Sequence, residues 1–279
     1  MNDKLNDKLN DKPTYKALAI DLDGTLLIGE DLPPAHKKAV ADADRAGFEI
    51  IIATARWRQM AQRIAAEIGI SAPVIACSGA QVYIPAEQRD IFDHRLPADF
   101  VSEVYAICDS QRCIVTVTTD EDTFLKLDGE PDPSQMPEEM KWIPKLTGTE
   151  NSLPRIATIQ GSAVIGTIKS ELKDRYADTV NIYDSIGPTG KLILTMTAKA
   201  ANKGHALLAA CEHIGINPAE VIAFGDAEND ISMFEVAGAS VAMGQADERV
   251  KSAATRVTAA NTEDGVALVI DKLLATGDL

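Results

Sequence analysis

The chain has 279 residues, 46% of them hydrophobic, which suits a globular protein of one large domain or two modest ones. Its 27 basic and 42 acidic side chains give a formal net charge of −15, which opposes binding to nucleic acid or to an anionic membrane surface. No apolar run approaches the roughly 20 residues that span a bilayer, and the polar N-terminus does not resemble a signal peptide. With four scattered cysteines that indicate reduced thiols, we expect a cytoplasmic protein.

The N-terminal segment is polar. Residues 2–12 repeat NDKL-NDKL-NDK, which offers little to bury, and Pro13 follows. We therefore expect residues 1–13 to be a flexible tail outside the fold.

Two aspartates come at the end of the first apolar run, which extends from about Lys16 to Asp21. In an extended chain residues i and i+2 share a face, so Asp21 and Asp23 can leave the strand end side by side. Such carboxylates repel each other unless a cation shares their site, and Gly24 permits a sharp turn that exposes both. The pair predicts a metal site able to attack phosphorus, whereas the alternative is an ordinary strand ending in an Asp-Gly turn.

Apolar strands and helices then alternate along the chain. Before residue 85 we expect a helix that Pro33 and Pro34 open and that runs to Arg45, a strand from Phe48 to Ala53, a helix from Trp57 to Ile68 and a strand from Val74 to Ala76. After residue 200 we expect a helix from Asn202 to Ile214 and strands at Val221–Phe224 and Ala239–Ala242. Strands rich in Ile and Val between helices predict an α/β fold with a doubly wound parallel sheet covered on both faces.

The middle of the chain has a different texture. From about residue 85 to 195 it contains many prolines, and the strand candidates Cys113–Thr119 and Ile156–Gln160 alternate apolar with polar residues. Alternation of this kind indicates a sheet with one solvated face. We expect a core domain of residues 14–84 plus 197–279, interrupted by an inserted α+β domain of residues 85–196.

A threonine and an arginine follow the second core strand. Thr54 could donate its hydroxyl to a phosphate oxygen, and the backbone N–H groups after it, at a helix start, also suit phosphate. The alternative for Thr54 is a plain helix N-cap. Arg56 could contact the phosphate side of a site or be a solvated charge.

The third strand end of interest carries the sequence GDAEND at residues 225–230. Its acidic side chains would lie at the carboxyl edge of the sheet, where open α/β folds bind ligands. Asp226 is our choice for a direct Mg²⁺ ligand, while Asn229 and Asp230 would orient the site or contact phosphate. The alternative is an acidic helix start. Lys203 is less specific: it could be solvated, or it could supply the positive charge that carboxylates and phosphate require.

Taken in order, these pieces resemble the four motifs of the haloacid dehalogenase superfamily. They are DLDGT at residues 21–25, Thr54, Lys203 and GDAEND at residues 225–230. The insertion after the second motif, with VAMG at residues 241–244 and EDGVA at residues 263–267, is similar to Cof-type phosphatases with a class IIB cap. The resemblance implies a Rossmann-like core, and it identifies the inserted domain as a substrate-specificity cap.

The resemblance also implies roles for individual residues. Asp21 would be the nucleophile that forms an aspartyl-phosphate, and Asp23 the general acid and base. Mg²⁺ would be held by the side chains of Asp21 and Asp226 and the backbone carbonyl of Asp23. Phosphate would be bound by the backbone at Leu22 and Ala55, by Thr54, by Lys203 and by Asn229. Asp230 and Arg56 would support this site.

The expected function is therefore a Mg²⁺-dependent phosphatase acting on a small phosphorylated metabolite, with a sugar phosphate as the expected class. A phosphomutase of the same fold and a non-catalytic phosphometabolite-binding regulatory protein remain alternatives, and the oligomeric state, monomer or homodimer, stays open. The chain departs from the family pattern in having Ala55 where Gly is usual and Ser78-Gly79 where Asn-Gly is frequent. These departures leave the phosphate chemistry in place but weaken any transfer of substrate preference.

Overall fold

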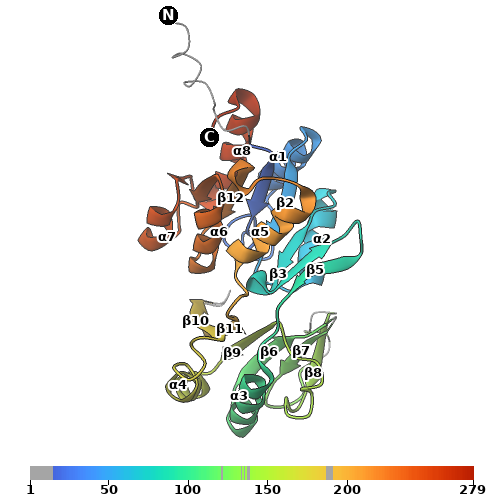
Figure 1. The fold of residues 1–279 in the computed structure, drawn as a ribbon, viewed down its shortest axis with the longest axis vertical. Coiled ribbons are helices and arrows are strands. Elements are labelled where there is room, and N and C mark those ends of the chain that lie inside the picture. Colours follow the sequence, from blue (N-terminus) through green and yellow to red (C-terminus); the bar gives the residue numbers. More distant parts are fainter. Residues whose placement is uncertain (1–14, 121, 133, 135, 137–138, 187–190) are drawn as a thin grey trace, which may run out of the picture.

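The structure, a computed structural model, describes residues 15–120, 122–132, 134, 136, 139–186 and 191–279. The expected flexible tail, residues 1–13, lies outside the described residues. The described chain forms an eight-stranded and a six-stranded sheet, which lie toward opposite ends of the long axis (Figure 1). No helix in the described ranges combines the length and apolar character needed to cross a bilayer.

The eight-stranded sheet forms the core domain, and its strand order is β14-β13-β12-β1-β2-β3-β4-β5. The strands are β1 (Ala17–Ile20), β2 (Glu49–Ala53), β3 (Val74–Ala76), β4 (Gln81–Ile84), β5 (Arg89–Asp93), β12 (Val221–Gly225), β13 (Ala239–Ala242) and β14 (Arg256–Val257). All neighbours are parallel except β3 with β4 and β4 with β5. Because β1 lies between β2 and β12, the carboxyl ends of these three strands meet.

Helices cover both faces of this sheet. They are α1 (Pro34–Arg45), α2 (Arg58–Ile68), α5 (Lys203–Ile214), α6 (Ile231–Val236), α7 (Glu248–Ala253) and α8 (Gly265–Thr276). Leu18 and Ile20 of β1 join the apolar cluster under α1, α2 and α8, whereas Ala17 and Ala19 join the cluster under α5, α6 and α7. Both side-chain sets of β1 are thus buried, which explains its uninterrupted apolar sequence and confirms the doubly wound α/β prediction.

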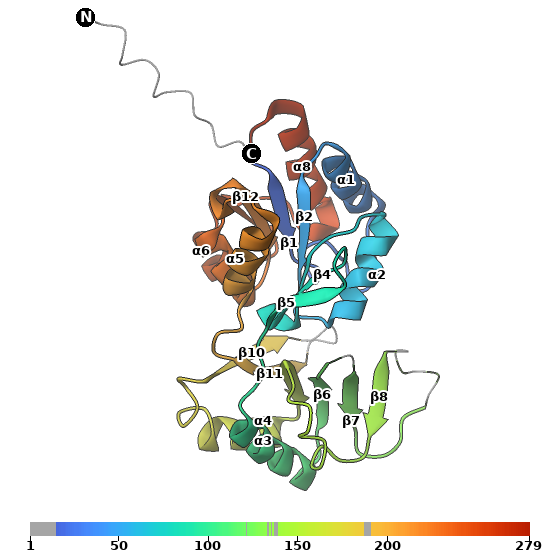
Figure 2. The ribbon, with the colours of Figure 1, turned by 45° about the vertical axis from the view of Figure 1, so that its right-hand side comes forward.

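The six-stranded sheet has the order β10-β11-β9-β6-β7-β8. Its strands are β6 (Ile114–Thr118), β7 (Thr123–Lys126), β8 (Met140–Ile143), β9 (Ile156–Gln160), β10 (Val180–Ile186) and β11 (Leu192–Ala198). Helices α3 (Ala98–Ser110) and α4 (Ser162–Glu171) lie together beside this sheet (Figure 2), and their apolar residues share one cluster with its strands. In β6, Val115 and Val117 join that cluster while Ile114 and Thr116 do not, which is the alternation of a sheet packed on one face.

Short 3₁₀ turns complete the described chain: η1 (Cys77–Gly79), η3 (Pro218–Glu220), η4 (Glu228–Asp230) and η5 (Asn261–Glu263). The predicted elements differ from the observed ones by one residue at some ends. Strands β3, β9 and β13 have the predicted bounds, and α1 begins at Pro34, the second of the two prolines expected to open it. The first crossing between the domains was expected near residue 85, and we propose a later position for it. Strand β5 pairs with β4 in the eight-stranded sheet, so we place this crossing after Asp93.

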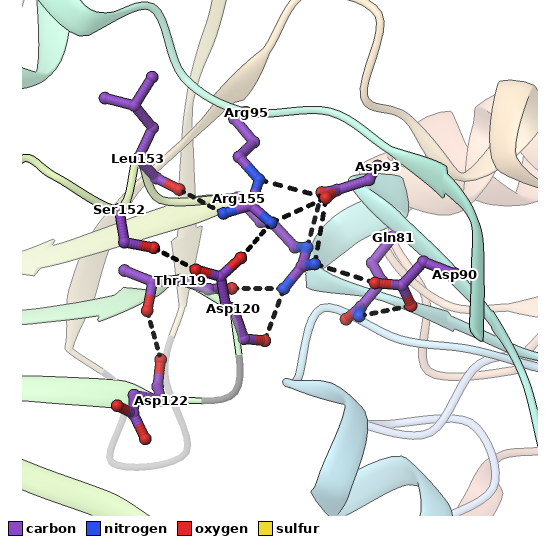
Figure 3. Close-up of polar contacts among 10 residues, drawn as sticks. All are labelled: Gln81, Asp90, Asp93, Arg95, Thr119, Asp120, Asp122, Ser152, Leu153 and Arg155. Atoms are coloured by element: carbon purple, nitrogen blue, oxygen red, sulfur yellow. Dashed lines mark hydrogen bonds and ion pairs between the residues drawn. The ribbon is translucent and has the colours of Figure 1, made fainter. Parts of the chain in front are cut away.

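A buried arginine joins the two sheets at this crossing (Figure 3). The Arg155 side chain is 3% exposed; its Nε donates to Asp93 Oδ1 at 2.8 Å and its Nη2 to Asp90 Oδ2 at 3.0 Å. Both aspartates belong to β5 in the core sheet. Nη1 of Arg155 donates to the carbonyl oxygens of Thr119 and Asp120, the latter at 2.7 Å, in the loop after β6. One guanidinium therefore ties the cap to the core.

Candidate active site

The candidate site lies where β1, β2 and β12 end. Ile20, the last residue of β1, pairs with Ile52 of β2 and with Phe224 of β12. The residues that follow these strands, Asp21, Thr54 and Asp226, are therefore brought to one edge of the sheet. The sequence placed each of them at a strand end, and the topology makes those ends neighbours.

A buried ammonium group connects two of the carboxylates. Lys203 is the first residue of α5 and is 1% exposed. Its Nζ donates to Asp21 Oδ1 and to Asp230 Oδ1, each at 2.6 Å. Burial alone would lower the pKa of Lys203, but the two carboxylates outweigh burial and raise it. Lys203 therefore stays charged and is a member of the site rather than a solvated side chain.

The carboxylates outnumber this ammonium. Oxygen atoms of Asp21, Asp226 and Asp230 all lie within 4.8 Å of one another. The pKa of Asp21 is raised well above its ordinary value, mainly by burial and also by Asp230 and Asp226, against the opposing effect of Lys203. Burial, followed by the Asp230 charge, raises the pKa of Asp226 to about 7. Ionising the whole cluster requires more positive charge than Lys203 supplies.

Asp230 is already engaged by the protein. Besides accepting from Lys203, its Oδ2 accepts from the backbone N–H groups of Asp226 and Ala227, each at 3.0 Å. Asp230 thus shapes the loop that carries Asp226 and holds the lysine. Asp21 and Asp226 remain as carboxylates that could take a cation, and hard Mg²⁺ prefers a few such oxygen ligands. The donor set fits a Mg²⁺ site.

Gly24 makes room for Asp226. Its φ of +78° lies in the left-handed region, and a Cβ added there would stand 2.2 Å from Asp226 Oδ2. The neighbouring Thr25 donates its hydroxyl to Asp226 Oδ1 at 3.2 Å. The turn after β1 is therefore built around the Asp226 carboxylate, which the simple Asp-Gly turn interpretation does not explain.

The side chain of Asp23 takes a different direction. It is 44% exposed and forms an ion pair with Arg56, whose Nε donates to Oδ1 at 3.0 Å and to Oδ2 at 2.8 Å. Arg56 also donates to Glu30, with Nη1 2.7 Å from Oε2. Arg56 is thus paired in this structure. The carboxylate of Asp23 does not join the acidic cluster, where Asp230 is the third member.

The predicted phosphate-binding residues differ in burial. Thr54 and Leu22 are buried, whereas Ala55 is exposed. Thr54 Oγ1 accepts from Arg56 N at 3.1 Å, so this hydroxyl orders the loop after β2 and retains its own proton for donation. The Oδ1 atom of Asn229 is buried with no hydrogen-bond partner among the described residues.

Sequence reasoning did not assign a role to Ser78. It has a positive φ of 56°, and its N–H donates to the carbonyl oxygen of Thr54 at 3.1 Å. Its buried Oγ, like Asn229 Oδ1, has no partner in the described part of the chain. The Ser78-Gly79 sequence, in place of the more frequent Asn-Gly, was the one feature of the sequence that drew attention to Ser78. The backbone of Gly79 packs closely on Asn202: a Cβ added at Gly79 would lie 2.2 Å from the carbonyl carbon of Asn202.

A cavity of about 350 Å³ extends from this region toward the cap. Its core side includes Ser78, Asn202 and Asn229, and its cap side includes Lys173, Tyr183 and Lys199. No sequence motif pointed to the cap residues. The site thus combines a buried carboxylate, an ammonium group, a candidate cation position and a space for a bound molecule.

Comparison with known proteins agrees with this chemistry. Residues 18–270 match the family described as haloacid dehalogenase-like hydrolase. The 5-amino-6-(5-phospho-D-ribitylamino)uracil phosphatase YwtE of Bacillus subtilis is 28% identical, over 93% of this chain and 98% of its own length. The pyridoxal phosphate phosphatase YbhA of Escherichia coli is 27% identical, over 92% of this chain and 98% of its own.

Solved structures have the same architecture. The structure of a sugar phosphatase of haloacid dehalogenase subclass IIB superimposes with a TM-score of 0.76 at 25% identity, covering 92% of this chain and 98% of that one. A structure from Thermotoga maritima gives a TM-score of 0.78 at 26% identity, covering 92% of this chain and 97% of that one. Similarity over both sheets extends the resemblance to the core and the cap together.

Proposed function

Because this chain belongs to the haloacid dehalogenase-like hydrolase family and is a phosphatase of that family, we propose that it hydrolyses a small phosphorylated metabolite with Mg²⁺ and an aspartyl-phosphate on Asp21. One observation carries this proposal. The Asp21 carboxylate is buried at a strand end, is held by Lys203 at 2.6 Å, and lies in a cluster whose negative charge calls for a cation.

In the first step, a carboxylate oxygen of Asp21 attacks phosphorus, and the bond from phosphorus to the ester oxygen breaks. The hydrogen bond from Lys203 fixes the orientation of the Asp21 carboxylate, so this side chain loses little conformational entropy at the moment of attack. Asp23 gives a proton to the departing alkoxide. Its half-exposed position suits this task, although its carboxyl group must first part from Arg56.

In the second step, Asp23 takes a proton from water, the water oxygen attacks phosphorus, and the Asp21–phosphoryl bond breaks. The products are an alcohol and inorganic phosphate, and the nucleophile is regenerated. Backbone N–H groups near Leu22 and Ala55, the Thr54 hydroxyl, Lys203 and Asn229 bind the phosphoryl oxygens in this proposal. Asn229 would donate to a phosphoryl oxygen through its amide nitrogen, because its buried Oδ1, which has no partner among the described residues, can only accept.

Asp21 and Asp226 would hold Mg²⁺ with their side chains, together with the backbone carbonyl of Asp23. When bound, Mg²⁺ neutralises charge on the carboxylates and on the phosphoryl group. Asp230 supports the site from outside by fixing the N–H groups of Asp226 and Ala227. Arg56 supports it by holding Asp23 between turnovers.

The proposed substrate is a sugar phosphate or a similar phosphomonoester. The cavity of about 350 Å³ is in the range of small-molecule sites, and one structural neighbour is a sugar phosphatase. We place the protein in the cytoplasm because its four cysteines are free and buried. Its oligomeric state, monomer or homodimer, is left open in this proposal.

The testing experiment measures inorganic phosphate released from a panel of phosphorylated sugars, nucleotides and cofactors, with Mg²⁺ or with a chelator. We expect Mg²⁺-dependent release of phosphate equal to the substrate consumed. Conversion of substrate into an isomeric phosphate without free phosphate would identify a mutase instead. Binding without any turnover would favour a regulatory protein.

A further inference from the structure

The cavity between the sheets carries positive charge that the phosphoryl chemistry does not use. We propose that the substrate has a second anionic group, a carboxylate or a second phosphate, which Lys173 and Lys199 bind at the cap end of the cavity while the phosphoryl group lies at Asp21. This inference rests on the proposed function and specifies its substrate class. It follows from three observations: the direction of the cavity, the position of the lysines and their lack of partners.

The core end of the cavity adjoins the reacting groups. Asn229 lines the cavity and directly precedes Asp230, which is bonded to Lys203. Ser78 lines it too, and its N–H is bonded to the carbonyl of Thr54. At this end the buried Ser78 hydroxyl can donate a hydrogen bond to a bound molecule, and the buried Oδ1 of Asn229 can accept one. A phosphoryl group at Asp21 would therefore have the rest of its molecule in the cavity.

The cap end brings together two lysines that are distant in sequence. Lys173 follows α4, and Lys199 follows β11. The N–H of Lys199 donates to the carbonyl oxygen of Thr179 at 2.8 Å, which joins the end of β11 to the segment between α4 and β10. Both lysines are exposed and both line the cavity. Val180 and Ile182 also line the cavity and supply apolar surface suited to an uncharged carbon chain.

Neither lysine is neutralised within the described part of the protein. Lys173 and Lys199 form no ion pair there, whereas other cap cations do: Lys169 with Asp184 at 2.6 Å, Lys141 with Asp122 at 2.6 Å and Arg175 with Glu103 at 2.7 Å. The acid that also lines the cavity, Glu228, lies 2.5 Å from Arg249. In a chain with 42 acidic and 27 basic residues, two unpaired ammonium groups on one cavity form a local anion site.

The test compares kcat/KM within two matched substrate pairs. Fructose 1,6-bisphosphate is set against fructose 6-phosphate, and 6-phosphogluconate against sorbitol 6-phosphate. We expect the wild type to prefer the member with the second anion in at least one pair by about tenfold, mainly through KM, and less so at high salt. In the Lys173→Ala/Lys199→Ala variant this preference should fall to about twofold or less.

The matched control is Lys145→Ala, which removes an exposed cap lysine that does not line the cavity and should keep the preference. Equal use of both members of each pair by the wild type, or an unchanged preference in the double variant, would overturn the inference. Hydrolysis of p-nitrophenyl phosphate tests the proposed function separately. Thermal shifts of Asp21→Asn with the same pairs show the binding preference even where turnover is absent.

Discussion

Asp226 is the carboxylate on which the electrostatic repulsion within the acidic cluster can be tested most directly. It is close to Asp21 and Asp230, and its pKa is raised to about 7, first by burial and then by the Asp230 charge. Above that pH the folded protein without metal must hold an ionised carboxylate that the unfolded chain would ionise freely in water. The raised pKa is therefore a source of instability that is present at high pH and relieved as the pH falls.

Replacing Asp226 with Asn should reveal this conflict. Asn keeps the shape but removes the charge, so we expect the metal-free variant at pH 8 to melt about 2–4 °C higher than the wild type. Added Mg²⁺ should stabilise the wild type and leave the variant unchanged. Differential scanning calorimetry with and without Mg²⁺ measures both effects. A variant that melts lower without metal and still responds to Mg²⁺ would remove Asp226 from the proposed ligand set.

The same pKa sets a pH dependence for metal binding. Mg²⁺ needs the carboxylate of Asp226, and below pH 7 a proton occupies that group in the metal-free protein. We expect Mg²⁺ affinity to be nearly constant above this pH and to fall by up to about tenfold per pH unit below it. Titration calorimetry between pH 5.5 and 8.5 checks this course. An affinity that is flat across the range would contradict the assignment.

The proposed roles of Asp23 and Asp21 can be distinguished by the choice of leaving group in the substrate. An aryl phosphate departs without protonation, so Asp23→Asn should still transfer the phosphoryl group to Asp21 but fail to activate water. We expect a burst of p-nitrophenol followed by slow turnover, and a protein heavier by one phosphoryl group in intact mass spectrometry. Asp178→Asn, which alters an exposed acid, is the control. Wild-type steady-state turnover by Asp23→Asn would exclude the proton-transfer role.

At the scale of elements, the turn after β1 is the feature most tightly constrained by the site. Gly24 and Gly29 both have positive φ, of +78° and +62°. A Cβ at Gly24 would strike Asp226 Oδ2 at 2.2 Å, whereas one at Gly29 would meet nothing within 4 Å. The two glycines therefore separate backbone strain from intrusion into the site.

Gly24→Ala and Gly29→Ala form a matched pair for this element. Each should lose about 1 kcal/mol of unfolding free energy from the left-handed conformation. Only Gly24→Ala should also lose Mg²⁺ affinity and phosphatase activity, because its methyl group displaces the Asp226 carboxylate. Urea unfolding and Mg²⁺ titration of both variants measure the two effects. Equal Mg²⁺ affinity in the two variants would show that the turn does not position Asp226.

The elements also show where sequence reasoning succeeds and where it fails. Strand β3 has the predicted bounds and helix α1 begins at one of the two prolines expected to open it, because a buried apolar run and an opening proline are local signals. The strand ends that carry Asp21 and Asp226 could likewise be predicted from the sequence. The change in texture from about residue 85 placed the segment of β5 in the expected inserted domain. Its membership of the core sheet depends on pairing with β4, which no local pattern shows.

Some residues of the site could also be predicted from the sequence, whereas others could not. Convergence of Asp21 and Asp226 follows from the order of parallel strands, so the sequence could predict it. Lys203 begins helix α5, and its bonds to Asp21 and Asp230 are apparent only in the folded chain. The pairing of Asp23 with Arg56 and the unpartnered Ser78 hydroxyl arise from loop packing between distant segments. The cap residues Lys173 and Lys199 follow no motif, and only the folded chain places them on one cavity.

For the whole molecule, the junction at Arg155 joins core and cap (Figure 3). Arg155→Met would leave two carbonyl oxygens and the carboxylates of Asp90 and Asp93 without this donor, so we expect a loss of about 2–4 kcal/mol in unfolding free energy. Hydrogen exchange should rise in β5 and in the loop after β6.

The matched control for the junction is Arg112→Met, which breaks a pair with Asp128 at 2.9 Å in which the arginine side chain is 92% exposed. Surface pairs of this kind contribute little, so this variant should unfold like the wild type. An equal loss of unfolding free energy in the two variants would mean that the burial of Arg155 does not make its contacts stronger. Unchanged hydrogen exchange in β5 of Arg155→Met would exclude Arg155 as the residue that joins the two domains.

The nucleophile itself is tested by phosphate release from p-nitrophenyl phosphate in the presence of Mg²⁺, compared between the wild type and Asp21→Asn. The amide cannot form the acyl phosphate, so we predict a fall of at least about a thousandfold with an intact fold by circular dichroism. Asp178→Asn should keep the wild-type rate. If Asp21→Asn releases phosphate within about tenfold of the wild-type rate, the proposed covalent mechanism on Asp21 is contradicted.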